Sequence, residues 1–458
     1  MTKVDIMNKQ INDYIYSKKS EILQNLAELV VIPSVKRTPE NGAPFGTEPK
    51  NALLKMREIC DKMGFKTTVY ENAVLCADFG ESPELGILAH LDVVPVQREN
   101  WHTNPFALVE KDGVLYGRGV IDDKGPAVAA LWALNAVKEL GLTLKNGVRL
   151  IFGTDEENGS EDLEIYKKHD KFPPKVFTPD GSFPVINIEK GMIRSRFFGN
   201  VSGNIVNFSG GNIPNAVADK ANAILSSVSL EIVCREIESD KTGAEFSATE
   251  DNGNVEISCK GKAAHASTPQ TGINAVTALI SLINRICGND VTQGLERLFP
   301  FGETDGSALG LKCADDSGTL TAVFSKFSID DGVCKGTVDI RFPTCTNLVT
   351  VKDTLKANFE KVGLNYEMIL GDEPHIVPEN SEFVQKLLSV YEQIEGEKGK
   401  CIAIGGGTYV HNIDGGVAFG AERGDTDYNM HGDNEFITVD ELLKDAILYA
   451  NAIIEICG

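Results

Sequence analysis

The sequence is short of positive charge and of aromatic side chains. Its 458 residues include 44 lysines and arginines against 66 aspartates and glutamates, which gives a formal net charge of -22, and only 7% of the residues are aromatic. A strongly acidic chain is poorly suited to bind nucleic acid or an anionic membrane surface through charge. We therefore expect no nucleic acid and no membrane among its partners.

Long apolar runs and cysteine motifs are also missing. No stretch of 18 uncharged apolar residues occurs, and the polar residues 1–5 lack the apolar core of a signal peptide. The ten cysteines are scattered singly and form no C-x-x-C pair, which argues against a disulfide framework and for reduced thiols. Together these absences predict a cytoplasmic protein.

The length and the pattern of apolar residues predict two domains. A chain of 458 residues exceeds the size at which a single core stops growing. From Gly86 onward predicted strands, such as the apolar segment 148–152, alternate with predicted helices. This alternation is typical of a mostly parallel sheet. Beyond about Gly191 longer strands of period two, such as 336–341, mix with helices and indicate an α+β domain.

The order of these segments predicts an insertion. His431 is the best ligand candidate near the C-terminus, and it would complete a site in the first domain. The fold class we expect is therefore α/β, with a central mixed, mostly parallel sheet in the first domain. Residues 1–189 and 379–458 would form that domain, and residues 190–378 would be an inserted α+β domain.

Five residues are candidate metal ligands because each carries an imidazole or a carboxylate and follows a strand or lies in a turn-rich loop. They are His90, Asp122, Glu157, Asp180 and His431. Two metal ions about 3.5 to 4 Å apart need a bridging carboxylate, and roughly one imidazole and one further carboxylate each. The set supplies that count, with Asp122 as the bridge. Nitrogen and oxygen ligands without thiolate suit zinc, with manganese or cobalt as alternatives.

Two neighbouring acids have predicted roles of their own. Glu156 precedes the ligand Glu157 and cannot easily bind the same metal, but it is close enough to take a proton from a bound water, so we expect it to be the general base. Asp92 lies two residues past His90 on the same side of a strand, where it would accept the second imidazole N–H and orient the ring.

Each motif has a simpler interpretation when taken alone. The acidic run Asp155-Glu156-Glu157 could be a solvated face, and a single histidine is more often structural than a ligand. The functional interpretation gains weight because all the acidic motifs follow apolar strands, contain glycines that permit tight turns, and fall in one alternating domain.

These motifs resemble one family of enzymes. The chain is similar to the di-zinc metallopeptidases that include carboxypeptidase G, aminoacylase, succinyl-diaminopimelate desuccinylase and carnosinase, and within them to the PepV-type bacterial dipeptidases. The segments that carry the resemblance are His90-Leu91-Asp92, Gly117-Arg118-Gly119, Asp122-Asp123-Lys124-Gly125-Pro126, Asp155-Glu156-Glu157, Thr178-Pro179-Asp180-Gly181, Gly405-Gly406-Gly407-Thr408-Tyr409 and His431-Gly432-Asp433-Asn434-Glu435.

The resemblance implies a di-zinc exopeptidase-like catalytic domain of residues 1–189 and 379–458, with the inserted residues 190–378 as its lid domain. It also implies a ligand scheme. It makes Asp122 the metal bridge, assigns His90 and Asp180 to one metal, and assigns Glu157 and His431 to the other. It also implies that Glu156 is the acid and base of the reaction.

The resemblance further implies roles for the inserted domain. His265 would donate to the tetrahedral oxyanion, Asn215 would contact the substrate, and Arg341 would clamp the substrate's C-terminal carboxylate. Gly406 in the glycine run and Thr408 directly after it would also bind substrate. From the residues alone, Arg341 is by default a surface charge at a strand end, and His265 could equally be a packed histidine.

The sequence as a whole predicts a metal-dependent dipeptidase that acts on small peptides as a monomer or weak homodimer. An N-acyl or N-succinyl amino acid amidohydrolase with the same metals is the alternative enzyme. A binding protein without activity is a third possibility, but such a protein would be expected to lack a ligand or the base. His411 and Ala218 depart from the family pattern, so the preferred dipeptide stays open.

Overall fold

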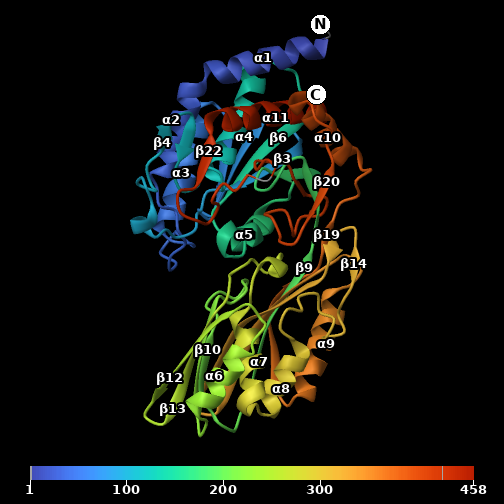
Figure 1. Ribbon diagram of the computed structural model, residues 1–458. Helices are drawn as coiled ribbons and strands as arrows, with labels where there is room; N and C mark the ends of the chain where they lie inside the picture. Colours follow the sequence, from blue (N-terminus) through green and yellow to red (C-terminus); the bar gives the residue numbers. More distant parts are fainter. Residues whose placement is uncertain (1–2, 425) are drawn as a thin grey trace. The chain divides into compact units, whose positions relative to one another are not determined.

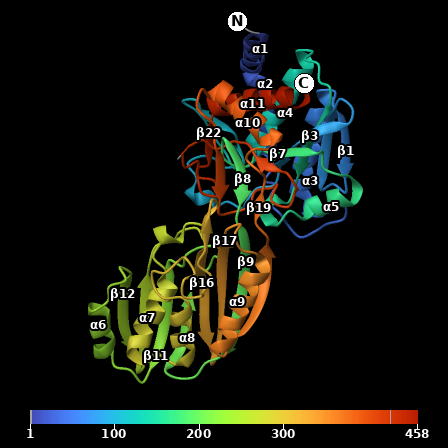
Figure 2. The same ribbon diagram turned by 90° about the vertical axis from the view of Figure 1, so that its right-hand side faces the viewer.

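A computed structural model describes residues 3–424 and 426–458. The chain divides into two compact units, each of which is visible in Figures 1 and 2. The first contains Met1–Ile188, Ile376–Ile402 and Thr408–Gly458, and the second contains Glu189–His375 and Ala403–Gly407.

The larger sheet of the first unit has the strand order β1-β2-β6-β3-β7-β21-β8-β19, and β20 also pairs with β8. Its central strands β6, β3, β7 and β21 are parallel, whereas β1, β2 and β8 join it in antiparallel pairings. The strands are β1 (Lys66–Tyr70), β2 (Val74–Phe79), β3 (Pro83–His90), β6 (Gly147–Gly153), β7 (Lys175–Thr178), β8 (Val185–Glu189), β19 (His375–Ile376), β20 (Cys401–Ile404) and β21 (Val417–Ala418).

Helices cover this sheet, and a small second sheet of order β22-β5-β4 accompanies it. The helices are α1 (Lys3–Ser17), α2 (Lys19–Val30), α3 (Thr47–Lys62), α4 (Lys124–Glu139), α5 (Glu161–His169), α10 (Glu382–Glu395) and α11 (Val439–Cys457), and the short strands are β4 (Val109–Lys111), β5 (Val114–Tyr116) and β22 (Phe436–Thr438). Helices α4 and α11 pack on β3 and β6 from one side, while α5 and residues 409–413 share a core with the other side.

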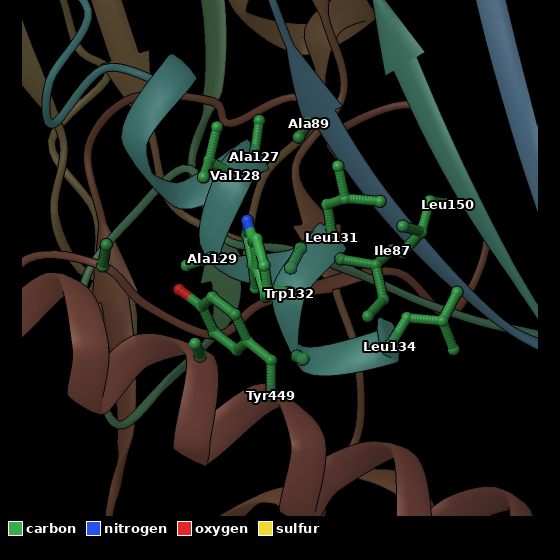
Figure 3. Packing of buried hydrophobic residues seen from close by; sticks show 14 of the residues in the cluster. Ile87, Ala89, Ala127, Val128, Ala129, Leu131, Trp132, Leu134, Leu150 and Tyr449 are labelled. Atoms are coloured by element: carbon green, nitrogen blue, oxygen red, sulfur yellow. The ribbon is translucent and has the colours of Figure 1, made fainter. Parts of the chain in front are cut away.

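Helix α4 fills the space between the sheet and α11. Leu131 and Leu134 point toward Ile87 and Leu150 of the central strands, and Tyr449 of α11 approaches from the opposite side (Figure 3). The helix starts tightly after the loop that carries Asp122, because a Cβ atom on Gly125 would lie 2.0 Å from the carbonyl oxygen of Val120. Only glycine therefore fits at that position.

The second unit is built on an antiparallel sheet of order β12-β13-β11-β10-β16-β17-β9-β18. Its strands are β9 (Gly191–Asn200), β10 (Ile205–Gly210), β11 (Lys220–Ser226), β12 (Glu245–Asp251), β13 (Asn254–Lys260), β16 (Thr321–Asp330), β17 (Val333–Phe342) and β18 (Asn365–Asp372), and a hairpin of β14 (Ala314–Asp315) and β15 (Gly318–Thr319) lies apart from them.

One face of this sheet carries the core of the second unit. Helices α6 (Leu230–Glu238), α7 (Ala275–Cys287), α8 (Asp290–Leu298) and α9 (Leu348–Lys361) lie along it (Figure 2). The strands alternate accordingly: Val338 and Ile340 are buried toward the helices, and Asp339 between them lies on the opposite face.

The expected α/β class, with a mixed sheet containing parallel strands, is confirmed, although the parallel pairings are confined to the middle of the sheet. Among the residues described, none of the helices combines the length and the apolar character that a membrane span requires.

Candidate metal centre

His90 stands at the end of the central strand β3. Leu85, Ile87 and Ala89 point to the core under α4, so strand alternation sends the His90 side chain to the opposite face. The residue is fully buried, and its Nε2 atom lies 3.0 Å from Asp122 Oδ1 and 3.8 Å from Asp180 Oδ2. Tyr409 stacks edge-on against the ring at 6.0 Å between centroids.

Asp122 joins two groups of candidate ligands. While its Oδ1 faces His90, its Oδ2 lies 2.9 Å from Nε2 of His431, which is also 3.0 Å from Glu157 Oε2. The ligand atoms of His90, Asp122 and Asp180, and likewise those of Asp122, Glu157 and His431, all lie within 4.8 Å of one another. The structure thus brings all five predicted ligands together, with Asp122 common to both groups.

The spacing of these atoms fits divalent ions. Four donors placed tetrahedrally about 2.0 to 2.1 Å from a zinc ion lie roughly 3.4 Å apart, close to the separations in both groups. Oε1 of Glu157 is buried without a hydrogen-bond partner among the described residues, so it has a free lone pair for an ion. The nitrogen and oxygen donor set therefore suits two metal ions.

The electrostatics of the cluster point the same way. Burial, followed by the nearby Asp122 carboxylate, raises the pKa of Glu157 to about 7, and burial likewise raises the pKa of Asp180 to about 7. Hydrogen bonds to Asp122 and Glu157 raise the pKa of His431 to about 11. The carboxylates crowd so much negative charge into a desolvated space that protons are retained, and divalent cations would neutralise the same charge.

Glu156 lies beside the two groups without belonging to either. It sits at the start of a short 3₁₀ turn, Glu156–Asn158, directly after β6. Burial and then the proximity of Asp180 hold the pKa of its carboxyl group well above the usual range. It is therefore a partly buried carboxyl group next to the candidate ligands, and its raised pKa favours the protonated form.

Asp92 orients the site by a different contact from the one expected. The closest acceptor to His90 Nδ1 is the backbone oxygen of Asp92 at 3.1 Å, while its carboxylate Oδ1 is 3.4 Å away. The carboxylate instead accepts hydrogen bonds from the backbone N–H groups of Glu156 and Glu157, each at 3.2 Å. Asp92 thus fixes the loop that carries the acids as well as the imidazole.

A buried ion pair that the sequence did not reveal connects two ligand loops. Glu435 is fully buried and accepts hydrogen bonds from the backbone N–H groups of Gly119, Ile121 and Asp122. Arg118 donates to Glu435 at 2.6 Å and also to the carbonyl oxygen of Gly432, next to His431. Both residues lie in motifs noted from the sequence, but the motifs do not show that Arg118 and Glu435 form an ion pair with each other.

Asp162 was likewise missed. Its Oδ2 atom accepts hydrogen bonds from the backbone N–H groups of Thr154 and Asp155 and from the Tyr409 hydroxyl at 2.6 Å. These bonds hold the turn that precedes Glu156. The residue occurs on helix α5, where an acid in the first turn looks like an ordinary N-terminal charge.

Glu422 is a third acid that the sequence did not single out. Its backbone pairs with residues 181–183, directly after Asp180, through a hydrogen bond from its N–H to Gly181 and one from Phe183 to its carbonyl oxygen. Burial and then the Asp122 charge raise the pKa of Glu422 to about 7. With the described residues its side chain forms no ion pair, and the charge of Asp122 acts on it.

The second unit gathers most of the remaining predicted residues. The N–H group of Ala266 donates to the Asn215 carbonyl oxygen, and His265 forms an isolated bridge with Ala216. Nδ1 of His265 lies 2.7 Å from the Ser267 hydroxyl, and a Cβ atom on Gly405 would lie 2.6 Å from Ser267 Cβ. The glycine run, with Gly406, therefore lies beside the segment that carries His265, whereas Thr408 belongs to the first unit.

Arg341 is not a surface charge. Its side chain is 7% exposed, and its Nε atom donates to Asp339 Oδ1 at 2.7 Å. Nη1 is 3.5 Å from the Gly405 carbonyl oxygen, and Nη2 is 3.5 Å from Asp339 Oδ2. Of the five N–H donors of a guanidinium group, one on each terminal nitrogen is left for a further ligand.

Comparisons with known proteins identify the class. The model of peptidase family M20/M25/M40 matches residues 86–455. The chain therefore belongs to this peptidase family, and its interpretation as a metallopeptidase is confirmed.

Individual relatives narrow the similarity further. The chain is 33% identical to the putative dipeptidase YtjP of Bacillus subtilis, covering 96% of this chain and 98% of that protein. It is also 33% identical to the Beta-Ala-Xaa dipeptidase of Lactobacillus delbrueckii subsp. lactis, covering 98% and 99%. The resemblance to dipeptidases of this family, inferred from the motifs, is thereby confirmed.

Solved structures share the fold. Human carnosine dipeptidase 1 aligns with a TM-score of 0.62 at 19% identity, and the dipeptidase Dug1p of Saccharomyces cerevisiae aligns with a TM-score of 0.61 at 15% identity. Each alignment covers 98% of both chains.

Proposed function

We propose that the protein hydrolyses dipeptides with a pair of divalent metal ions held by His90, Asp122, Glu157, Asp180 and His431. The observation that carries the proposal is the pair of ligand groups that share Asp122. Family membership and relatives named dipeptidases support the same activity. We propose zinc as the metal, because the donors are nitrogen and oxygen in sets of three.

Glu156 would move the proton in this reaction. Metal ions in the site would supply a Lewis acid that polarises the scissile carbonyl group. Glu156 takes the proton from the attacking water and passes it to the nitrogen of the leaving amino acid. The raised pKa of its carboxyl group, caused by burial and by Asp180, supports this role because it makes the carboxylate a stronger base than an ordinary glutamate.

Glu422 supports a dipeptide over an N-acyl amino acid as the substrate. A dipeptide carries a free ammonium group near its scissile bond, and an N-acyl amino acid has none. The carboxylate of Glu422, which is near the cluster and has no cation among the described residues as a partner, would pair with that ammonium group. An uncharged acyl group would leave this carboxylate partly buried and unpaired, which costs binding energy.

We propose that the second unit, residues 190–378, acts as a lid that supplies substrate contacts to a catalytic domain of residues 1–189 and 379–458. His265 would donate to the oxyanion and Asn215 would contact the substrate. Arg341 would bind the substrate's C-terminal carboxylate through its two free N–H groups, and Gly406 and Thr408 would line the backbone of the bound peptide. The contacts that link Asn215, His265, Gly405 and Arg341 within that unit support a common task.

We also propose that the protein works in the cytoplasm, as a monomer or weak homodimer. All ten of its cysteines are free thiols, and five of them are buried, which fits a reducing compartment.

A panel of substrates tests the activity. Protein reconstituted with zinc should hydrolyse dipeptides faster than tripeptides, N-acetyl amino acids and N-succinyl amino acids. Glu422→Gln should raise KM for dipeptides about tenfold and leave the slow hydrolysis of N-acetyl amino acids unchanged. Glu164→Gln, an exposed change on α5, is the matched control. Faster hydrolysis of N-acyl amino acids by the unaltered protein would establish the amidohydrolase alternative instead.

A further inference from the structure

The face of the second unit's sheet that the helices leave uncovered has a hollow of about 570 Å³. It lies over β9, β10, β11, β16, β17 and β18, within a single unit. Its volume falls in the range of small-molecule sites, roughly 300 to 1,000 Å³. None of the candidate metal ligands lines it.

Strand register explains how the hollow forms. In one row across the sheet, Ser209 of β10 pairs with Ser328 of β16, and Ser328 pairs with Lys335 of β17. In the next row Lys326 pairs with Thr337, which pairs with Arg196. Small hydroxyl residues thus occupy the middle of the face, and long side chains stand around them.

The charge of the hollow is opposite to that of the chain. Its lining contains four basic residues, Arg196, Lys220, Lys326 and Lys335, and a single acid, Glu367, which leaves a net charge of +3 in a chain of net charge -22. Arg196 is paired with Glu367, with two contacts of 2.8 and 2.7 Å. The three lysines form no ion pair with the residues described, so their charge is available to an anion.

The lysines lie close enough to act on one ligand. Lys326 and Lys335 are diagonal neighbours across the β16–β17 pair, and such neighbours have Cα atoms about 7 to 8 Å apart. Gly211 donates its backbone N–H to the carbonyl oxygen of Lys220, which places Lys220 at the β10 side of the same hollow. The hydroxyl groups of Ser209 and Ser328 make no hydrogen bond with described residues and are further donors.

An aromatic ring lies beside these donors. Phe198 is the cross-strand partner of Lys335, and it is 38% exposed although it is a large apolar side chain. A planar ring stacked on Phe198 would cover this apolar surface while phosphate oxygens reach the lysines. The hollow therefore combines a stacking surface with a floor of hydroxyl groups and a basic rim.

The hollow is separate from the proposed substrate contacts. One face of β17 carries every second side chain, namely Lys335, Thr337, Asp339 and Arg341. Arg341 is four residues beyond Thr337, which corresponds to roughly 13 Å along a strand. Asp339 is fully buried between them and is paired with Arg194 and Arg341. A ligand in the hollow would not occupy the free donors of Arg341.

We propose that this hollow binds a nucleotide: a phosphate ester whose base stacks on Phe198 and whose phosphate is held by Lys326, Lys335 and Lys220. The inference does not depend on the proposed peptidase activity, because it rests on different residues in a different part of the chain.

Calorimetric titration of the full-length, metal-loaded protein with AMP tests the proposal. AMP should bind with a stoichiometry of one and more weakly as the salt concentration rises. Lys326→Ala combined with Lys335→Ala should weaken AMP binding at least about tenfold. Phe198→Ala should weaken AMP but leave inorganic phosphate unchanged. Lys361→Ala, an exposed lysine on α9, is the control and should bind AMP normally.

Several results would overturn the proposal. Absence of AMP binding, or binding that survives the double lysine substitution, would remove the hollow as its site. An equal loss in Lys361→Ala would reduce the effect to general charge. Inorganic phosphate that binds as tightly as AMP, or adenosine that does so, would show that the hollow does not recognise a nucleotide.

Discussion

The two units use a sheet in different ways. In the first unit the central strand β3 is buried on both faces, with Ile87 packed under α4 and Leu88 packed toward α5. In the second unit one face of β17 packs under the helices, and the other carries Lys335, Thr337, Asp339 and Arg341, of which Lys335 is exposed and the last two are buried. Charged groups of the first unit are therefore gathered at strand ends, and those of the second are spread along the face of a strand.

The difference has a chemical consequence. At the strand ends of the first unit, carboxylates and imidazoles are desolvated together, so their pKa values move far from the usual range and a cation is strongly favoured. On this face of the second unit, acids balance the arginines: Asp339 pairs with Arg194 and Arg341, and Glu367 pairs with Arg196. The first arrangement suits chemistry, whereas the second suits recognition.

Asp122→Ala should have the largest effect, because it removes the residue that joins the two ligand groups. Loss of the shared carboxylate should abolish binding of at least one metal ion and lower kcat/KM for dipeptides by about 10⁴-fold or more. Metal content measured by atomic emission, together with steady-state kinetics, checks this. Asp112→Ala, in an exposed turn, should leave both unchanged.

Two tightly bound ions in Asp122→Ala would show that the bridge lies elsewhere in the cluster. The contrast drawn between the two units would then be wrong, because the buried carboxylates at the strand ends of the first unit would not be what binds the metal.

Much of this difference could be predicted from the sequence. The continuous apolar run Leu85 to Ala89 predicts a strand buried on both faces, and the alternation in 336–341 predicts one apolar face. The five ligand candidates could be chosen because imidazoles and acids follow apolar strands. The structure brings them together as that pattern suggested.

Other features depend on tertiary contacts that no local pattern encodes. Glu435 accepts hydrogen bonds from the backbone of residues 119–122, which lie more than 300 positions away in the sequence. Asp339 accepts hydrogen bonds from Nε and Nη2 of the Arg341 guanidinium group. An acid in a sequence looks the same whether it pairs internally or faces solvent, so these partners could not be assigned. The contact of the Asp92 carboxylate with the 156–157 backbone was missed for the same reason.

Glu156→Gln should have the second largest effect and should separate chemistry from metal binding. The amide keeps the size of the side chain but cannot accept the proton, so kcat should fall on the order of 10²-fold to 10⁴-fold while both metal ions stay bound. Single-turnover kinetics and metal analysis on the same sample measure this. Glu161→Gln, in the first turn of α5, is the control, and near-normal turnover in Glu156→Gln would exclude Glu156 from proton transfer.

Glu435→Gln should have a smaller effect on activity. It tests whether metal binding by the cluster depends on the hydrogen bonds that Glu435 accepts from Arg118 and from the backbone of residues 119–122. The amide places an N–H group against backbone donors of residues 119–122 and leaves Arg118 without a full counter-charge. Metal affinity, measured by competition with a chelator, should fall about 10-fold to 100-fold. Glu455→Gln, an exposed change on α11, is the control and should keep full metal affinity. Full metal affinity in Glu435→Gln would show that the Arg118–Glu435 pair only stabilises the fold.

Arg341→Lys should have the smallest effect and moves the test to the second unit. Lysine keeps the charge but loses the two N–H groups that remain free on the guanidinium fork, so kcat/KM should fall about tenfold for dipeptides and hardly at all for their C-terminal amides. Arg194→Lys is a matched control, because Arg194 pairs with the same Asp339. Equal losses for dipeptide and amide would make Arg341 a structural partner of Asp339, and His411, beside the glycine run, would be the next residue to test as the carboxylate ligand.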